Sequence, residues 1–286
     1  MSIDRVTVLG AGTMGHGIAI NAATAGYEVV IFDIDDEAAK AGLGRCRAFL
    51  DKGVARGKTT EAQRDAALAL LSSSSDLATA VGRADLVIEA APENLELKRR
   101  IFSDLGQFCP PHCILASNTS SCSVTEMGLA SGRADRVIGA HFFNPVPIMK
   151  LLEVIVTEQT SDATRAALLT FGERLGKTTA VIKDSPGFAT SRLGIAIALE
   201  AIRMVEQGVA EPSDIDTCME LGYRFPMGPL RLTDLVGLDV RLGIADTIFA
   251  ATHSPVFEAP QLLRTMVANG QLGRKAGQGF YDYNEA

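Results

Sequence analysis

The sequence lacks an excess of positive charge. Its 27 lysines and arginines are outnumbered by 34 aspartates and glutamates, which gives a formal net charge of -7 and a sequence pI of about 5.2. Domains that bind nucleic acids present a basic face to the phosphates, so this balance argues against a nucleic acid as partner. Any anionic ligand must bind at a local basic patch.

Long apolar runs are also missing. No stretch approaches the roughly 20 apolar residues that a membrane-spanning helix needs, and the start of the chain lacks the basic segment, apolar stretch and cleavage site of a secretory signal. We therefore expect a cytoplasmic protein with no membrane partner.

Cysteine is sparse, and its spacing shows no pairing pattern. The five cysteines include no Cys-x-x-Cys motif, which argues against a disulfide framework or a redox motif and is typical of a reducing compartment. The segment Cys109–Cys113 (Cys-Pro-Pro-His-Cys) has no matching second pair of zinc ligands, and its two prolines restrict its geometry. No metal is expected.

The chain does show a change of pattern near residue 184. With 286 residues, of which 47% are hydrophobic, it can form more than one core. Up to about residue 183, short β-branched runs alternate with longer helical patterns, as in βαβ units around a mostly parallel sheet. The expected strands cover residues 6–9, 28–33, 86–90, 114–117, 137–141, 151–156 and 179–182.

The turn Asp184–Gly187 ends this pattern. Beyond it strand-like runs almost vanish, and apolar residues at helical spacing predict helices within residues 188–207, 211–221, 228–250 and 259–269. The predicted fold class is α/β, with a Rossmann-type, mostly parallel sheet in residues 1–184 and a second, all-helical domain in residues 185–286.

A glycine-rich turn follows the first expected strand. Gly10-Ala11-Gly12-Thr13-Met14-Gly15 matches G-x-G-x-x-G between a strand and a helical run. In this pattern the first glycine permits a tight turn, the second lets backbone approach a pyrophosphate, and the third lets helix pack on strand. The helix N-terminus adds N–H donors. The segment Gly10–Gly15, including Thr13 and Met14, is predicted to bind a dinucleotide.

Asp33 ends the second expected strand, twenty-three residues after Gly10. The dinucleotide-binding fold places an acid there, on the ribose hydroxyls. Beside the 2′-phosphate of NADP the carboxylate would be a costly like-charge neighbour, so NAD is the expected cofactor. The alternative role for Asp33 is to cap the helix expected from about residue 35.

His141 ends the expected strand 137–141, and open α/β sheets bind ligands at the carboxyl ends of their strands. Oxidation of an alcohol by hydride transfer needs a base for the hydroxyl proton, which neutral imidazole suits. Glu153 is the one acid in the apolar strand 151–156, and it would orient and stabilise an adjacent imidazolium. The alternatives are a structural buried imidazole and an edge-strand glutamate that faces water.

The segment Ser117–Ser121 (Ser-Asn-Thr-Ser-Ser) follows the strand 114–117 and brings hydroxyl and amide groups to the same edge of the sheet. The alternative is a capping role for the helix expected from Val124 onward, which would suit Ser121 or Ser123.

Taken together, the glycine-rich turn, Asp33 and four further motifs resemble the 3-hydroxyacyl-CoA dehydrogenase family. These motifs are Ser117–Ser121, His141–Pro145 (His-Phe-Phe-Asn-Pro), Pro186–Phe188 (Pro-Gly-Phe) and Pro226–Pro229 (Pro-Met-Gly-Pro). They occur in order along essentially the whole chain, whose length resembles the stand-alone short-chain type. The resemblance implies an oxidoreductase that transfers a hydride between NAD and C3 of (S)-3-hydroxybutyryl-CoA or acetoacetyl-CoA.

The resemblance also implies roles for individual residues. His141 is the expected catalytic base, Glu153 its partner, and Ser120 a hydrogen-bonding residue for the reacting oxygen of the substrate. The implied cofactor contacts outside the glycine-rich turn and Asp33 are Glu93, Lys98, Ser120, Asn144 and Lys275. For Lys98 and Lys275, the alternative is a solvated surface lysine.

One position departs from the family pattern. The family often has Asn after Pro-Gly-Phe-x-x, where this sequence has Ser191. Serine is shorter and has one donor, so it would contact the substrate through water, or the oxygen would rely on Ser120 and the imidazolium alone. Ser191 and Asn144 are the candidates for a further substrate contact.

Residues 44–59 provide the basic patch that a CoA ligand requires. Five basic residues stand against Asp51 alone, a net charge of +4. In the family a helical excursion after the second strand contacts the adenosine-phosphate end of CoA, which makes Arg56 and Lys58 the candidate CoA contacts. A solvated helix face is the alternative explanation of these charges.

The expected partners are a short-chain acyl-CoA and, from the resemblance, a second copy of the chain in a homodimer, with residues 185–286 serving substrate binding and dimerisation. The alternatives are a dehydrogenase of broader chain length, a sugar-acid 3-dehydrogenase of gulonate type, and a crystallin-like dinucleotide-binding structural protein. The basic segment favours CoA over a sugar acid, and His141, Glu153 and Ser120 argue against the structural protein.

Overall fold

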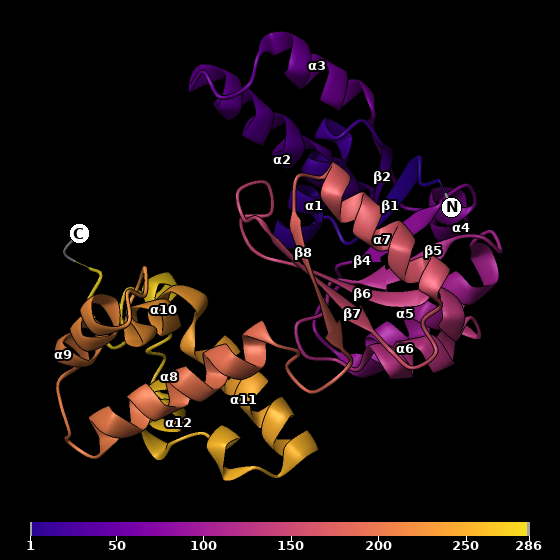
Figure 1. Ribbon diagram of the computed structural model, residues 1–286. Coiled ribbons are helices and arrows are strands. Elements are labelled where there is room, and N and C mark those ends of the chain that lie inside the picture. The colour runs from indigo at the N-terminus through magenta and orange to yellow at the C-terminus, as the bar shows by residue number, and fades with distance from the viewer. Residues whose placement is uncertain (1, 285–286) are drawn as a thin grey trace. The chain divides into compact units, whose positions relative to one another are not determined.

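The computed structural model describes residues 2–284. The chain divides into two compact units, Met1–Ser185 and Pro186–Ala286. In Figure 1 the first unit runs from indigo to pink, and the second from orange to yellow.

The first unit is built on one eight-stranded sheet in the order β3-β2-β1-β4-β5-β6-β7-β8. All neighbouring strands pair parallel except β6 and β7, which pair antiparallel. The prediction of a Rossmann-type, mostly parallel sheet is confirmed. The strands are β1 (Arg5–Leu9), β2 (Glu28–Phe32), β3 (Leu71–Ser74), β4 (Leu86–Glu89), β5 (Ile114–Ser117), β6 (Val137–Phe142), β7 (Leu151–Val156) and β8 (Thr178–Lys183).

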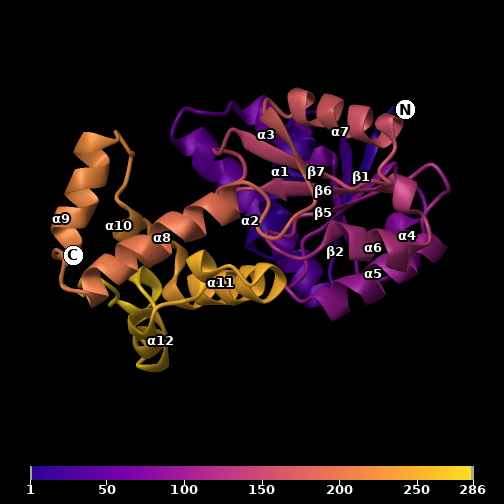
Figure 2. The ribbon, with the colours of Figure 1, turned by 60° about the horizontal axis from the view of Figure 1, so that its bottom comes forward.

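Helices cover both faces of this sheet. On one face lie α4 (Leu77–Val81), α5 (Leu95–Phe108) and α6 (Val124–Ser131), and on the other lie α1 (Thr13–Thr24) and α7 (Asp162–Arg174) (Figure 2). A hairpin of α2 (Asp36–Ala55) and α3 (Glu61–Ala69) follows β2 (Figure 1). The short turn η1 (Ala134–Arg136) leads into β6. Because both faces are covered, the central strands are apolar and almost fully buried.

Local side chains define where several helices begin. Asp35 accepts a hydrogen bond from Ala38 N at 2.7 Å and caps α2, so the alternative that Asp33 caps this helix is wrong. Thr60 begins α3 with a capping box, and Ser123 caps α6. The capping role considered for Ser121 or Ser123 therefore falls to Ser123.

The sequence analysis missed one strand and one helix boundary. β3 reads Leu-Ser-Ser-Ser, which has little of the β-branched and aromatic content typical of strands; it forms because it pairs with β2 at the edge of the sheet. The helical stretch expected over residues 228–250 is two helices, α10 (Pro229–Val236) and α11 (Leu238–Thr252). The break falls at Gly237, whose φ of 106° ends the first helix.

The second unit packs its helices around α8 (Thr190–Glu206), which contacts α10, α11 and α12 (Gln261–Ala268) (Figure 1). Ile195, Leu199 and Ile202 of α8 are fully buried against Leu230 and Ile248. Around these lie α9 (Pro212–Thr217), the π-helical turn η2 (Cys218–Gly222), η3 (Pro255–Phe257) and η4 (Arg274–Ala276). Extended pairing among its described residues is limited to isolated bridges near the C-terminus, so the prediction of a helical second domain is confirmed.

No helix in residues 2–284 is both long and apolar enough to cross a membrane.

Packing of β6 against β7 predicts a large stability effect at Gly139. A Cβ at this position would lie 2.7 Å from the Cβ of Ile155, so we expect Gly139→Ala to lower the free energy of unfolding by about 1–3 kcal/mol. In the matched control, Gly44→Ala, the added methyl meets nothing within 4 Å in α2, and helix propensity should raise stability by about 0.5–1 kcal/mol. Urea unfolding of both variants measures the difference; equal stabilities would contradict this account of the strand packing.

Candidate functional site

The glycine-rich turn joins β1 to α1 at the carboxyl edge of the sheet. Gly10 has a φ of 95°, and a Cβ there would lie 2.7 Å from the carbonyl oxygen of Ala90. A Cβ at Gly15 would overlap the carbonyl oxygen of Gly10. Gly12, by contrast, is exposed and has nothing within 4 Å of a Cβ position. Gly10 and Gly15 are therefore needed for packing, whereas Gly12 leaves open space for a ligand.

Asp33 faces this turn from the end of β2. Its carboxylate accepts hydrogen bonds from Ala11 N and Ile34 N, each at 2.8 Å. The bond from Ala11 N ties the glycine-rich turn to the end of β2. Each carboxylate oxygen keeps a lone pair for a ligand hydroxyl, so the arrangement suits a ribose.

A cavity of about 650 Å³ connects these elements. Gly10, Gly12, Thr13 and Met14 line one part of it together with Asp33, and apolar side chains of α4 and α5 line another part with Ile34. Among the described residues that line the cavity there is no Lys, Arg or His. A 2′-phosphate beside Asp33 would meet a carboxylate with no cation in the lining, whereas a ribose hydroxyl would find an acceptor.

His141 lies between an acid and a hydroxyl at the same edge of the sheet. The β6–β7 register places His141 directly opposite Glu153, and His141 Nδ1 lies 2.7 Å from Glu153 Oε2. On the far side of the ring, Nε2 lies 3.1 Å from Ser120 Oγ. The side chain of Glu153 is 1% exposed, so the alternative of an edge-strand glutamate facing water is wrong.

This geometry defines what the imidazole can do. The Glu153 carboxylate accepts the Nδ1 hydrogen, which fixes the tautomer and leaves the Nε2 lone pair directed to Ser120. A proton taken up at Nε2 would produce an imidazolium that Glu153 stabilises. An imidazole held in this way by a buried carboxylate is able to take up a proton at Nε2.

Glu93 anchors the segment that carries Ser120. Its Oε1 accepts hydrogen bonds from Thr119 Oγ1 at 2.6 Å and from the backbone N–H groups of Ser120 and Ser121 at 2.9 Å. Burial raises the pKa of Glu93, but the Lys98 ammonium and these hydrogen bonds outweigh burial and hold the pKa below its ordinary value. An ionised Glu93 therefore fixes the backbone of Ser120.

Lys98 is buried, with a side chain 1% exposed, so the alternative of a solvated surface lysine is wrong. Its Nζ lies 2.6 Å from Glu89 Oε1 and 3.4 Å from Glu93 Oε2. Glu89, which the sequence analysis did not single out, also accepts hydrogen bonds from Ser117 Oγ at 2.5 Å and Ala91 N at 2.7 Å. An acid at the carboxyl end of the apolar strand β4 was the signal that could have found it.

Asn144 lies in the loop after β6 and is exposed. A second residue missed in the sequence, Lys177, holds this loop: its buried Nζ donates to the carbonyl oxygens of Val146 at 2.5 Å and Met149 at 2.8 Å. Asn118 Oδ1 accepts a hydrogen bond from Phe142 N at 2.8 Å and links the loop after β5 to β6.

Arg56 and Lys58 lie in the connection between α2 and α3. They line a cavity of about 310 Å³ with Lys52 and with apolar side chains that include Phe49 and Ile148. The basic segment therefore borders a concave, partly apolar surface, and its side chains Lys52, Arg56 and Lys58 are exposed, as the alternative of a solvated helix face also expects.

Two of the predicted site residues belong to the second unit. Ser191 lies in the first turn of α8 and is half-buried. Lys275, in η4, forms an ion pair with Asp239 at 2.6 Å, and its side chain is 48% exposed.

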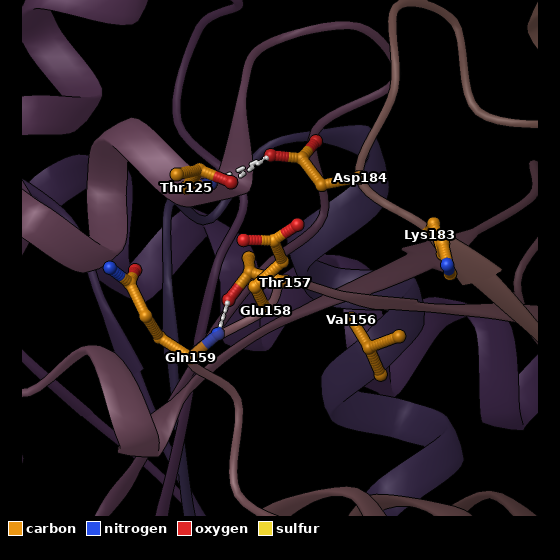
Figure 3. Close-up of a pocket in the computed structure, with 7 residues that line it drawn as sticks. All are labelled: Thr125, Val156, Thr157, Glu158, Gln159, Lys183 and Asp184. Carbon is orange, nitrogen blue, oxygen red and sulfur yellow. Dashed lines mark hydrogen bonds between the residues drawn. The ribbon is translucent and has the colours of Figure 1, made fainter.

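Another cavity, of about 520 Å³, lies where β7 and β8 end (Figure 3). There Asp184 accepts hydrogen bonds from the backbone N and Oγ1 of Thr125, and Lys183 and Glu158 also line the cavity. None of its lining residues is a predicted site residue. Within residues 2–284 no group of three or more His, Cys, Asp or Glu side chains is placed to hold a metal ion.

Comparisons with known proteins agree over the whole chain. Residues 5–185 match the family model described as 3-hydroxyacyl-CoA dehydrogenase, NAD binding domain, and residues 187–283 match the C-terminal domain of the same family. The chain is 45% identical over 285 residues to the probable 3-hydroxybutyryl-CoA dehydrogenase of Bacillus subtilis, covering 100% of this chain and 99% of that protein. It is 44% identical over 284 residues to a 3-hydroxybutyryl-CoA dehydrogenase of Mycobacterium tuberculosis, covering 99% of each.

Solved structures show the same relationship. The crystal structure of (S)-3-hydroxybutyryl-CoA dehydrogenase PaaH1 from Ralstonia eutropha matches with a TM-score of 0.95 and 42% identity, over 99% of this chain and 100% of that one. The structure of M. tuberculosis FadB2 matches with a TM-score of 0.95 and 43% identity, again over 99% and 100%. The family resemblance seen in the sequence is confirmed: this chain belongs to the 3-hydroxyacyl-CoA dehydrogenase family, and its first unit is the NAD-binding domain of that family.

Proposed function

We propose that this protein interconverts (S)-3-hydroxybutyryl-CoA and acetoacetyl-CoA with NAD as cofactor. The observation that carries the proposal is the placement of His141 between Glu153 and Ser120, at the sheet edge that also holds the glycine-rich turn. The names of the relatives supply the substrate.

The chemistry follows from these side chains. In oxidation, Nε2 of His141 takes the proton of the C3 hydroxyl while Glu153 stabilises the resulting imidazolium. Ser120 Oγ, within hydrogen-bond distance of the same nitrogen, donates to the substrate oxygen. Bound NAD supplies the acceptor for the hydride that leaves C3. In reduction, the imidazolium returns its proton to the oxygen of the 3-oxo group.

The residues of the NAD-binding domain fit the cofactor. Gly12 leaves open space at the N-terminus of α1 for a pyrophosphate, and Asp33 offers acceptors for the ribose hydroxyls. Further cofactor contacts are assigned, by resemblance to the family, to Glu93, Lys98, Ser120, Asn144 and Lys275. For Lys98, burial between Glu89 and Glu93 supports an indirect contribution, in which it keeps Glu93 ionised beneath Ser120.

Arg56 and Lys58 are the proposed contacts for CoA. Together with Lys52 they bring three positive charges to one cavity of a protein whose net charge is -7. Apolar side chains in the same lining would pack against the adenine ring. A free sugar acid has a carboxylate but neither phosphate groups nor an adenine ring to occupy this basic and partly apolar surface, which favours an acyl-CoA over a gulonate-type substrate.

We assign substrate binding and dimerisation to residues 185–286, and a cytoplasmic location to the protein. The exposed apolar side chains of the helical unit support a homodimer, because large exposed apolar surfaces commonly mark interfaces; they are Leu193, Ile197, Leu232, Leu235, Val236 and Val240. Five free cysteines suit a reducing compartment.

The deciding experiment measures NADH consumption with acetoacetyl-CoA. Longer 3-oxoacyl-CoAs, a gulonate-type sugar acid assayed in the oxidative direction with NAD, and NADPH in place of NADH are run in parallel. Rapid turnover with acetoacetyl-CoA and NADH supports the proposal. Equal turnover with longer chains would indicate a broader-chain enzyme, and activity on the sugar acid alone would overturn the CoA assignment.

Replacement of His141 should remove the chemical step while leaving the cofactor site intact. We expect His141→Ala to lower turnover by about 10²- to 10⁴-fold, with NADH affinity unchanged in a fluorescence titration. The control is His112→Ala, because His112 is exposed and bonds to Asp85 away from the site. Full turnover in His141→Ala would rule out its role as the base.

Asp33 should govern both cofactor affinity and cofactor choice. Asp33→Asn keeps the shape but removes the charge, so one charge-assisted hydrogen bond to the ribose is weakened, and the KM for NADH should rise about tenfold or more. The preference for NADH over NADPH should narrow, because the repulsion of a 2′-phosphate is lost. Asp35→Asn, at the cap of α2 two residues away, is the control and should change neither constant.

A further inference from the structure

The helical unit contains a largely buried arginine whose side chain has no protein partner among residues 2–284, and of its guanidinium nitrogens only Nε is fully buried. Arg241, in α11, is 7% exposed, and its Nε is buried with no hydrogen-bond partner. No ion pair or hydrogen bond joins its side chain to any residue within the described part of the chain. Burial lowers the pKa of Arg241 to about 10, which still leaves the side chain charged at neutral pH.

The other buried charged side chains within residues 2–284 have hydrogen-bond or ion-pair partners. Lys98 pairs with Glu89, Lys177 donates to two carbonyl oxygens, and Asp234 accepts from the backbone N–H groups of Phe280 and Tyr281. A charged side chain that is mostly removed from water and has no partner lowers stability, and the accessible Nη atoms of Arg241 leave its donors open to a ligand. An arginine held in this state is best explained if its partner is a ligand that binds during the reaction.

The direction of the guanidinium indicates where that ligand binds. Arg241 Nη1 lies 3.4 Å from the position that a Cβ would take at Gly194 of α8. Gly194 is three residues after Ser191, and positions three apart are neighbours on one face of a helix. The absence of a side chain at Gly194 therefore lets the guanidinium reach the face of α8 that carries Ser191.

The first turn of α8 offers further hydrogen-bond donors beside the guanidinium of Arg241. Its N-cap residue, Ala189, has no side-chain cap, so the positive end of the helix dipole is not offset there by a capping side chain. The Ser191 hydroxyl lies in the same turn. A guanidinium, a hydroxyl and a helix N-terminus together favour an oxygen atom that carries negative charge or acquires it during the reaction.

We infer that Arg241 binds a carbonyl oxygen of the 3-oxoacyl thioester and replaces the amide donor that the family often places at position 191. The inference rests on the proposed function. The hydroxyl of Ser191 has a single donor hydrogen, and glycine at 194 leaves room for the guanidinium of Arg241 from α11, which has several donors. Arg241 is then a substrate-binding residue contributed by the helical unit.

The first test is Arg241→Met, which keeps the length of the side chain and removes its charge. The kcat/KM for acetoacetyl-CoA should fall about tenfold to a hundredfold, as expected for loss of a hydrogen bond to a charged group, while the KM for NADH is unchanged. The melting temperature should stay the same or rise, because an apolar side chain replaces an unpaired buried ion. Arg264→Met, at an exposed arginine paired with Asp246, is the matched control and should keep wild-type kinetics.

The second test restores the amide donor. In the double variant Arg241→Met/Ser191→Asn, the asparagine should recover about tenfold or more of the lost kcat/KM, whereas Arg241→Met/Ser191→Ala should recover nothing. A merely structural arginine would not be rescued by an amide on another helix. If Arg241→Met does not fold, Arg241→Lys replaces it in the test. Lysine retains the positive charge but lacks the planar, forked guanidinium. We then expect the KM for acetoacetyl-CoA to rise severalfold in Arg241→Lys.

Three outcomes would overturn the inference. Wild-type kinetics in Arg241→Met, or in Arg241→Lys where only that variant folds, would show that the guanidinium does not bind the substrate. If Ser191→Asn does not restore kcat/KM in the Arg241→Met background, Arg241 does not replace an amide donor at position 191. A change of oligomeric state in gel filtration together with the kinetic loss would assign its partner to a second copy of the chain. Wild-type protein that does not reduce acetoacetyl-CoA would instead refute the proposed function itself.

Discussion

The antiparallel pairing of β6 with β7 is the constraint on which the candidate site depends. The loop between these strands spans only residues 143–150, too short for the crossover that a parallel neighbour would need. β7 therefore runs back beside β6, and its register sets Glu153 opposite His141. A carboxylate buried in this position needs a hydrogen-bonding partner, and the imidazole provides one. The reversal of the chain between these strands thus places a buried carboxylate against the imidazole of His141.

A second set of charged side chains positions Ser120 at the carboxyl edge of the sheet. Lys98, buried in α5, pairs with Glu89 at the end of β4 and lies near Glu93, whose carboxylate holds the backbone of Ser120. One ammonium faces two carboxylates, and hydrogen bonds from Ser117, Ala91 and residues 119–121 supply the remaining donors to these carboxylates. The hydroxyl beside His141 is thereby fixed by residues that do not themselves contact the imidazole.

The helical unit contains both satisfied buried charges and one exception, Arg241. Asp216 and Asp234 are buried but accept several hydrogen bonds each, from the backbone and from tyrosine hydroxyls. Arg241 has no such compensation among the described residues. Stability alone would favour an apolar side chain at this position, so the arginine points to a requirement of function.

The sequence by itself determined the features that depend on local pattern. Strand and helix alternation, the Gly10–Gly15 turn and the spacing to Asp33 are encoded within short windows, and they were enough for the fold class and the cofactor. The sequence analysis did not predict β3, because its three serines follow no strand pattern. Tertiary structure alone decided that His141 contacts Glu153, that Lys98 is buried and that Arg241 has no partner within residues 2–284. These contacts join residues on different elements, and their burial and pairing arise only when those elements pack.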